Sequence, residues 1–205
     1  MTAPAVRDDA PAKRQQAVVV LIELRNFTRM SEMLEAAKVL ELASDFFSLA
    51  ARAVEEHEGE VFAVRNDSLL AAFRTGATVH FVEQAVNAAQ MIQREFGALA
   101  ESWERDYGLK TAVALGLHLG DAIFGTVGPK AERRRAVFGD TASITERLAH
   151  RARAGEFVMS EILFDTLAGA GIDLEAAEEL PALELVRRPP IPIYGVLLDL
   201  GLDFT

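Results

Sequence analysis

The run Ala17-Val18-Val19-Val20-Leu21-Ile22, followed at once by Glu23-Leu24-Arg25-Asn26-Phe27-Thr28, is the stretch that most directly predicts the fold. Six consecutive apolar residues, most of them β-branched, are typical of a strand buried on both faces. Asn26 interrupts the run, and asparagine tolerates the left-handed turn that can end a strand. We therefore expect a central strand that ends beside a carboxylate, Glu23.

Helical and strand patterns alternate after this run. Between the strands expected at 61–64 and 68–73, Arg65-Asn66-Asp67 predicts a tight hairpin, because Asn and Asp suit positive φ. The other expected elements are helices at about 31–58, 82–99 and 139–152, a short helix capped by Ser160, and strands at 111–119, from a turn at Gly120-Asp121 to about 128, at 157–159 and at 193–198. The order β-α-β-β-α-β, followed by more α and β elements, predicts an α+β fold with a ferredoxin-like centre.

Composition predicts one folded domain over residues 17–198, with a flexible tail at 1–16 and a short tail at 199–205. Of the 205 residues, 50% are hydrophobic and 25% are charged, which is enough apolar material for a core and argues against disorder. The absence of cysteine excludes disulfides, thiolate metal sites and cysteine nucleophiles. The four histidines lack metal-ligand spacing.

The net charge of -10 disfavours nucleic acid as a partner, because acidic chains repel phosphate backbones. The basic stretches are residues 130–135 and the pair Arg187-Arg188, and either one suffices to bind the phosphates of a single nucleotide. No apolar run reaches bilayer-spanning length and the N-terminus does not resemble a signal peptide, so we expect no membrane association and a cytoplasmic location.

Five groups of segments carry a resemblance to a known family. They are 20–28 with Ser31-Glu32; 57–61 with Asn66-Asp67 and 71–73; 116–121 with 124–128; 137–141 with Arg147-Leu148; and 192–196. In order and spacing they resemble the class III adenylyl and guanylyl cyclases over about residues 17–198. Each match alone is weak, but five collinear matches are hard to obtain by chance.

The resemblance implies a two-metal site. In that family two Asp side chains hold divalent metals that activate the ribose 3′-hydroxyl and grip the triphosphate. By position these are Glu23 and Asp67 here, and Glu23 places its carboxylate one methylene further out, where metal geometry must be nearly octahedral. The implied cofactor is Mg²⁺ or Mn²⁺ if any metal is bound, and it stays open that none is.

The substrate contacts implied by the resemblance are mostly degenerate. The two base-recognition positions are Ala63 and Ala136, which leave no side chain to distinguish adenine from guanine. The ribose-orienting position is Ser143, which is too short for the family's Asn contact.

Three kinds of cationic position remain. The transition-state Arg is retained as Arg147, one helical turn after Ser143. Arg187 or Arg188 could replace a phosphate-contacting Lys. Arg65 and Arg135 stand where the family usually has uncharged residues, so the pocket is expected to be more basic.

Three charged residues are retained at the implied site: Glu23, Asp67 and Arg147. Two of them have an ordinary structural explanation. Asp67 suits a hairpin, and Arg147 suits a helix-surface ion pair. Glu23 is harder to explain in this way, because burying an unpaired carboxylate is costly.

Three hypotheses of function follow. The first is a pseudo-cyclase, a cyclase homology domain without most substrate-recognition residues that acts in signalling as a nucleotide-binding or regulatory and dimerisation module. The alternative is a weak cyclase that forms a 3′,5′-cyclic nucleotide and pyrophosphate with relaxed base preference. The third is an interaction module that binds no nucleotide.

The resemblance also implies assembly, because the family forms its sites across a two-fold interface. A homodimer is expected, with Ile123, Phe124 and Val127 as apolar residues that a lone domain could not easily bury. ATP or GTP is the implied ligand, if one is bound. A heterodimer with an active cyclase would create a hybrid site in which Glu23 and Asp67 face the partner's substrate contacts.

Overall fold

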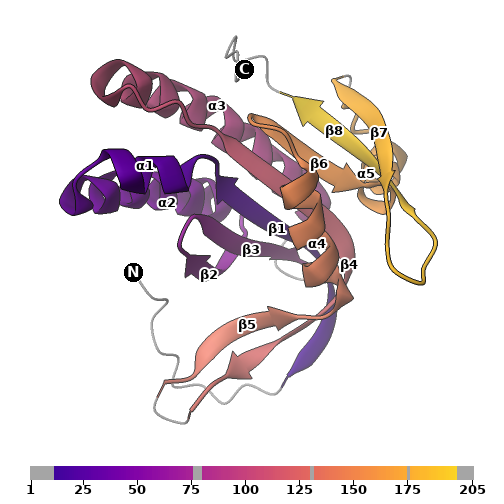
Figure 1. Cartoon of the computed structure of the whole chain (residues 1–205). Coiled ribbons are helices and arrows are strands. Elements are labelled where there is room, and N and C mark those ends of the chain that lie inside the picture. Colours follow the sequence, from indigo (N-terminus) through magenta and orange to yellow (C-terminus); the bar gives the residue numbers. More distant parts are fainter. Residues whose placement is uncertain (1–11, 76–79, 130–131, 175, 198–205) are drawn as a thin grey trace.

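The computed structural model describes residues 12–75, 80–129, 132–174 and 176–197 as one mixed α+β fold (Figure 1). Its elements in chain order are β1 (Lys13–Leu24), α1 (Phe27–Met33), α2 (Ala36–Glu56), β2 (Glu60–Arg65), β3 (Ser68–Arg74), α3 (Phe81–Tyr107), β4 (Val113–Val127), β5 (Arg134–Phe138), α4 (Asp140–Arg151), β6 (Glu156–Ser160), α5 (Glu161–Gly169), β7 (Ala177–Leu183) and β8 (Ile191–Leu197).

One sheet of eight strands organises these elements, in the order β2-β3-β1-β4-β6-β8-β7 with β5 paired to β4. Strands β1 to β4 with α2 and α3 form the βαββαβ unit, so the predicted ferredoxin-like centre is confirmed. The central pairs β1–β3 and β1–β4 are antiparallel, whereas β4 and β6 are parallel.

The two faces of the sheet are covered differently. Helices α2, α3 and α5 bury their apolar stripes against one face, where alternate β1 residues such as Val18, Val20 and Ile22 join the main core. Helix α4 lies across the opposite face (Figure 1), with Ile144 and Leu148 packed on Ala114. Both faces of β1 are therefore apolar along most of its length, as the unbroken hydrophobic run predicts.

Gly116 of β4 allows α4 to approach the sheet closely. A Cβ at this position would lie 2.3 Å from the backbone oxygen of Thr145 and 2.3 Å from the backbone nitrogen of Ala149. Only a residue without a side chain fits there, so the position of α4 over β1 and β4 depends on this glycine.

The expected turn at Gly120-Asp121 is wrong. Residues 113–127 form one continuous strand, because residues 120–124 continue their pairing with residues 13–17 of β1. The reversal comes after Val127, and β5 then pairs back along β4 from Arg134 to Phe138. Together β5 and the end of β4 form a two-stranded extension, which we call the arm (Figure 1).

Three further expectations need correction. Lys13 to Gln16, which were expected in a flexible tail, belong to β1 and pair with β4; residues 1–11 and 198–205 lie outside the described part of the chain. The helix expected at 31–58 is two helices, separated by Leu34 and Glu35 in extended conformations. Strand β7 carries no apolar alternation and was not expected.

The apolar residues of the arm are not all left for a partner to bury, contrary to the expectation. Phe124 is buried within the subunit, its ring 5.4 Å from that of Phe62, and Ile123 is half-buried. Val127 and Phe138 are exposed, at 44% and 51%. Because Phe138 pairs with Ile123 in register, these three exposed or half-exposed residues share one face of the arm.

Candidate functional site

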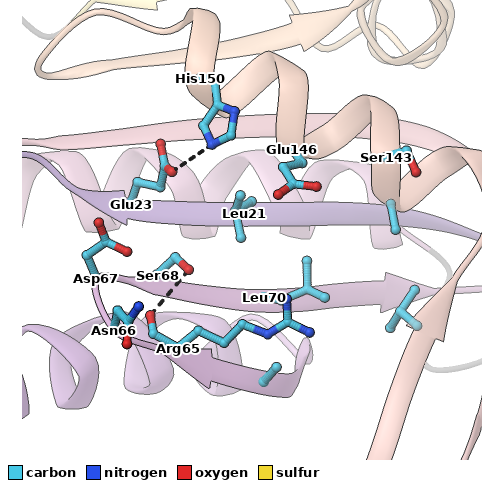
Figure 2. A pocket seen from close by; sticks show the side chains of 13 residues that line it. Leu21, Glu23, Arg65, Asn66, Asp67, Ser68, Leu70, Ser143, Glu146 and His150 are labelled. Carbon is cyan, nitrogen blue, oxygen red and sulfur yellow. Dashed lines mark hydrogen bonds and ion pairs between the residues drawn. The ribbon is translucent and has the colours of Figure 1, made fainter.

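A cavity of about 380 Å³ opens between α4, the end of β1 and the β2–β3 hairpin (Figure 2). Strand β1 contributes Leu21 and Glu23, because alternate residues of β1 face α4 and the others face the main core. The other lining residues are Ala63, Arg65, Asn66, Asp67, Ser68, Leu70, Val137, Ala142, Ser143, Glu146 and His150. The cavity thus brings together Glu23, Asp67 and Ser143, which are far apart in the sequence.

Asp67 reaches this cavity through the geometry of its hairpin. Asn66 has a φ of 35°, and Asn26 at the end of β1 has a φ of 63°, so both asparagines adopt the left-handed turns expected of them. The backbone nitrogen of Leu24 donates to the backbone oxygen of Asp67 at 2.8 Å. This bond holds the hairpin beside the end of β1, and Figure 2 shows the Asp67 carboxylate on the Glu23 side of the hairpin.

Glu23 is not the unpaired carboxylate that the sequence suggested. Its Oε1 lies 3.1 Å from His150 Nε2, and its Oε2 lies 3.1 Å from Arg25 Nη1. The Glu23 side chain is 12% exposed. Its Oε2 accepts no well-directed hydrogen bond from the described residues, so Arg25 neutralises this oxygen as an ion pair.

Arg25 is itself held in place by α4. Its Nη2 donates to the backbone oxygens of Ala149 and Ala152, at 2.8 and 2.9 Å. These carbonyls belong to the last turn of α4 and to its C-cap residue, where intrahelical donors run out and the helix dipole favours a cation. The guanidinium therefore joins the carboxylate of Glu23 to the end of α4.

Glu23 and Asp67 do not fit a pair of divalent metals in this arrangement. Mg²⁺ needs oxygen ligands at about 2.0–2.1 Å in a near-octahedral shell. Glu23 Oε2 is buried beside Arg25 and Oε1 lies beside His150, so an ion at either oxygen would have to displace a neighbouring side chain. Within the described ranges, no group of three or more His, Cys, Asp or Glu side chains is arranged to hold a metal ion.

A second cavity, of about 230 Å³, lies between β2 and the arm. Ala63 lines both cavities, whereas Ala136 lines only the second cavity. Ala136 lies on β5, where it pairs with Gly125 of β4. Arg65 also lines both cavities and is exposed. The two alanines present only methyl groups to the spaces that they line.

Arg135 is committed within the subunit. It forms an ion pair with Glu60, and its guanidinium lies over the Phe62 ring at 4.9 Å from the centroid. Burial lowers the pKa of Arg135, although guanidinium groups stay charged in proteins. Of Arg65 and Arg135, which stand where the family usually has uncharged residues, Arg65 is therefore the more accessible to a ligand.

Helix α4 presents Ser143, Glu146 and His150 to the first cavity, a spacing of three and four residues that selects one helical face. Arg147 is exposed on the same helix but lines neither cavity. Ser143 Oγ lies 3.5 Å from the backbone oxygen of Gly139, at the limit of a hydrogen bond. Arg147 can therefore act only on a ligand that extends beyond this cavity.

The two candidate phosphate-binding arginines lie on the connection between β7 and β8 and line neither cavity. Arg188 Nη1 forms a 2.5 Å ion pair with Asp140 at the beginning of α4, with both side chains exposed. Arg187 has a φ of 61° and is also exposed.

Sequence reasoning missed Arg25, His150 and Glu146. The helical spacing of 143, 146 and 150 was a usable signal for the two α4 residues. Arg25 had no such signal, because its partners in α4 lie 124 and 127 positions away. The buried histidine His118 is not part of this site: it bonds Ser160 Oγ at 2.7 Å, and burial lowers its pKa to about 4.

The sheet topology, the arm and the position of the first cavity define a nucleotide-cyclase type of domain. The model of the adenylate and guanylate cyclase catalytic domain matches residues 10–183. The chain belongs to this family, which confirms the resemblance seen in its motifs.

Individual relatives agree with this assignment. Adenylate cyclase 1 of Rhizobium meliloti (strain 1021) is 28% identical over 139 residues, 67% of this chain and 21% of the relative. The chain thus spans about a fifth of the length of that protein.

Solved structures share the fold. The adenylyl cyclase CyaB of P. aeruginosa has a TM-score of 0.82 at 19% identity, covering 92% of this chain and 97% of that one. The guanylate cyclase domain of RhGC from Catenaria anguillulae, solved with GTP, has a TM-score of 0.77 at 17% identity, covering 90% and 97%. Among the described residues, no helix is long and apolar enough to cross a bilayer.

Proposed function

We propose that this domain is a pseudo-cyclase: it keeps the fold and a nucleotide-sized cavity but does not cyclise ATP or GTP, and it acts as a regulatory module that binds nucleotide and dimerises. The observation that carries the proposal is the chemistry of the cavity walls. The side chain of Ala63, which lines both cavities, offers no hydrogen-bonding group, and neither does that of Ala136. The direct test is formation of cyclic product from ATP or GTP.

Charge in the first cavity further supports this proposal. Three carboxylates line it, on Glu23, Asp67 and Glu146, and Arg65 is the one arginine among its lining residues. A triphosphate bound there without metals would meet repulsion from Asp67 and Glu146. We therefore place its phosphates toward the exposed cations, Arg65 in the cavity mouth and Arg147 on α4.

Nucleotide binding is expected to stabilise the domain against heat, because a ligand that binds only the folded state raises the free energy of unfolding. At a concentration of one hundred times Kd the gain is about 2.7 kcal/mol. For a domain of this size that corresponds to a Tm rise of roughly 5–10 °C. Thermal-shift titration with ATP and GTP measures it, and Arg147→Ala should abolish most of the rise.

The matched control is Arg151→Ala, which removes an exposed arginine one turn further along α4. It should leave the nucleotide response intact. A flat titration up to millimolar ATP, GTP and their cyclic products would contradict nucleotide binding and leave a pure interaction module.

We also propose a homodimer formed through the arm, whose exposed face carries Val127 and Phe138. Light scattering at tens of micromolar protein should report twice the 22.3 kDa chain mass. Phe138→Asp should weaken the dimer, because it buries a charge in an apolar contact. Ile162→Asp, at a side chain 50% exposed on α5, is the control that should leave it unchanged. A wild-type monomer would contradict the dimer.

A further inference from the structure

We infer that Arg25, Glu23 and His150 form an internal ion-pair lock in the place where a cyclase metal would bind, so that this domain folds and binds its ligand without a divalent cation. That the domain binds a ligand rests on the proposed function, whereas the absence of a divalent cation from Glu23 concerns the protein alone.

The lock supplies the charge compensation that a metal would otherwise provide. A carboxylate that is 12% exposed needs a countercharge or hydrogen-bond donors to remain ionised at low cost. Arg25 provides a permanent cation at 3.1 Å from one oxygen. His150 Nε2 lies 3.1 Å from the other oxygen, within ion-pair distance.

The lock cannot coexist with a metal at Glu23. Oε2 is enclosed by protein, so an ion would have to displace Arg25 from the carbonyls of Ala149 and Ala152. An ion on Oε1 would have to displace His150 (Figure 2). Asp67 then remains as a single carboxylate, which is too few ligands to hold Mg²⁺ when no substrate phosphate is present.

The lock also connects two parts of the site. Glu23 lies on β1 and His150 on the last turn of α4, the helix that also carries Ser143 and Arg147. Arg25 binds the backbone of the same turn. The lock therefore positions α4 relative to the sheet. A metal bound at Glu23 could do this only if it replaced the contacts of the lock.

Metal binding without nucleotide tests the inference. Electron paramagnetic resonance of Mn²⁺ titrated into the wild-type protein should show no bound ion up to millimolar concentration. The Tm should be the same in Mn²⁺, Mg²⁺ and EDTA. One Mn²⁺ bound per chain and lost in Asp67→Asn would overturn the inference, whatever the result with nucleotides.

Opening the lock should create a response to metal. His150→Ala frees Glu23 Oε1, so its Tm in EDTA should fall by about 2–4 °C and partly recover in Mn²⁺. His150→Gln keeps a donor near Glu23 and should restore the wild-type Tm and its indifference to Mn²⁺. Arg151→Ala, on the same turn of α4, should change neither.

Two results with these variants would count against the lock. If His150→Ala melts like Arg151→Ala, the His150–Glu23 contact does not hold α4. If His150→Ala loses stability but ignores Mn²⁺, the lock does not stand in a metal position. Since no nucleotide is present in any of these samples, failure here leaves the nucleotide titration as a separate test.

Discussion

Gly116→Ala is expected to destabilise the domain more than a Gly→Ala substitution at any other glycine of the sheet. The new Cβ would meet the backbone of α4 at 2.3 Å on two sides, and backbone cannot rotate away as a side chain does. Overpacking in a core costs about 1–3 kcal/mol and occasionally more, and this contact belongs at the upper end. We expect a loss of about 3 kcal/mol and a Tm lower by roughly 6–12 °C in thermal denaturation.

Gly169→Ala is the matched control for this substitution. It adds the same methyl group near the end of α5, where no atom lies within 4 Å of the new Cβ. Because alanine is a better helix former than glycine, this variant should melt at or slightly above the wild-type temperature. If Gly116→Ala melted within a degree or two of wild type, α4 would not be packed against β4 as described.

The core of the fold was predictable because its signals are local. The apolar run at 17–22 and the three-and-four spacing over 82–99 are direct consequences of burial on a sheet and on a helix. β4 was harder, since Gly120 and Asp121 resemble a turn locally. The pairing of residues 120–124 with the first residues of β1 keeps that segment extended, and this contact is not local.

The site was predictable only in part, and for a similar reason. Asp67 and Ser143 line the same cavity, and the turn asparagines adopt positive φ. The chemistry of Glu23 could not be predicted, because Arg25 and His150 meet it only after α4 docks on the sheet. A carboxylate interpreted as a weakened metal ligand is, in the structure, one member of an ion-pair group.

The lock also bears on assembly with an active cyclase. A hybrid site would need Glu23 to coordinate a metal, and Glu23 would first have to release His150 and Arg25. The other composite site would combine the partner's metal residues with Ala63, Ala136 and Ser143 of this chain, so we expect this chain to contribute structure or regulation to a mixed dimer.

The second large effect concerns turnover itself. Loss of one transition-state donor typically lowers kcat by about 10²–10³-fold. Here Ser143 replaces the ribose-orienting Asn implied by the resemblance, Ala63 and Ala136 replace the base contacts, and Glu23 is engaged in the lock. Such losses do not multiply fully, yet even two of them acting together would reduce a slow enzyme to background.

The account is tested most directly by incubating the pure protein with ATP or GTP and Mn²⁺ and measuring cyclic nucleotide by mass spectrometry. We predict no cyclic AMP or cyclic GMP above the level of a protein-free sample, in Mn²⁺ or in Mg²⁺. Steady formation of either product by the wild type, abolished in Asp67→Ala, would contradict the account, because it would show a working metal site in this chain.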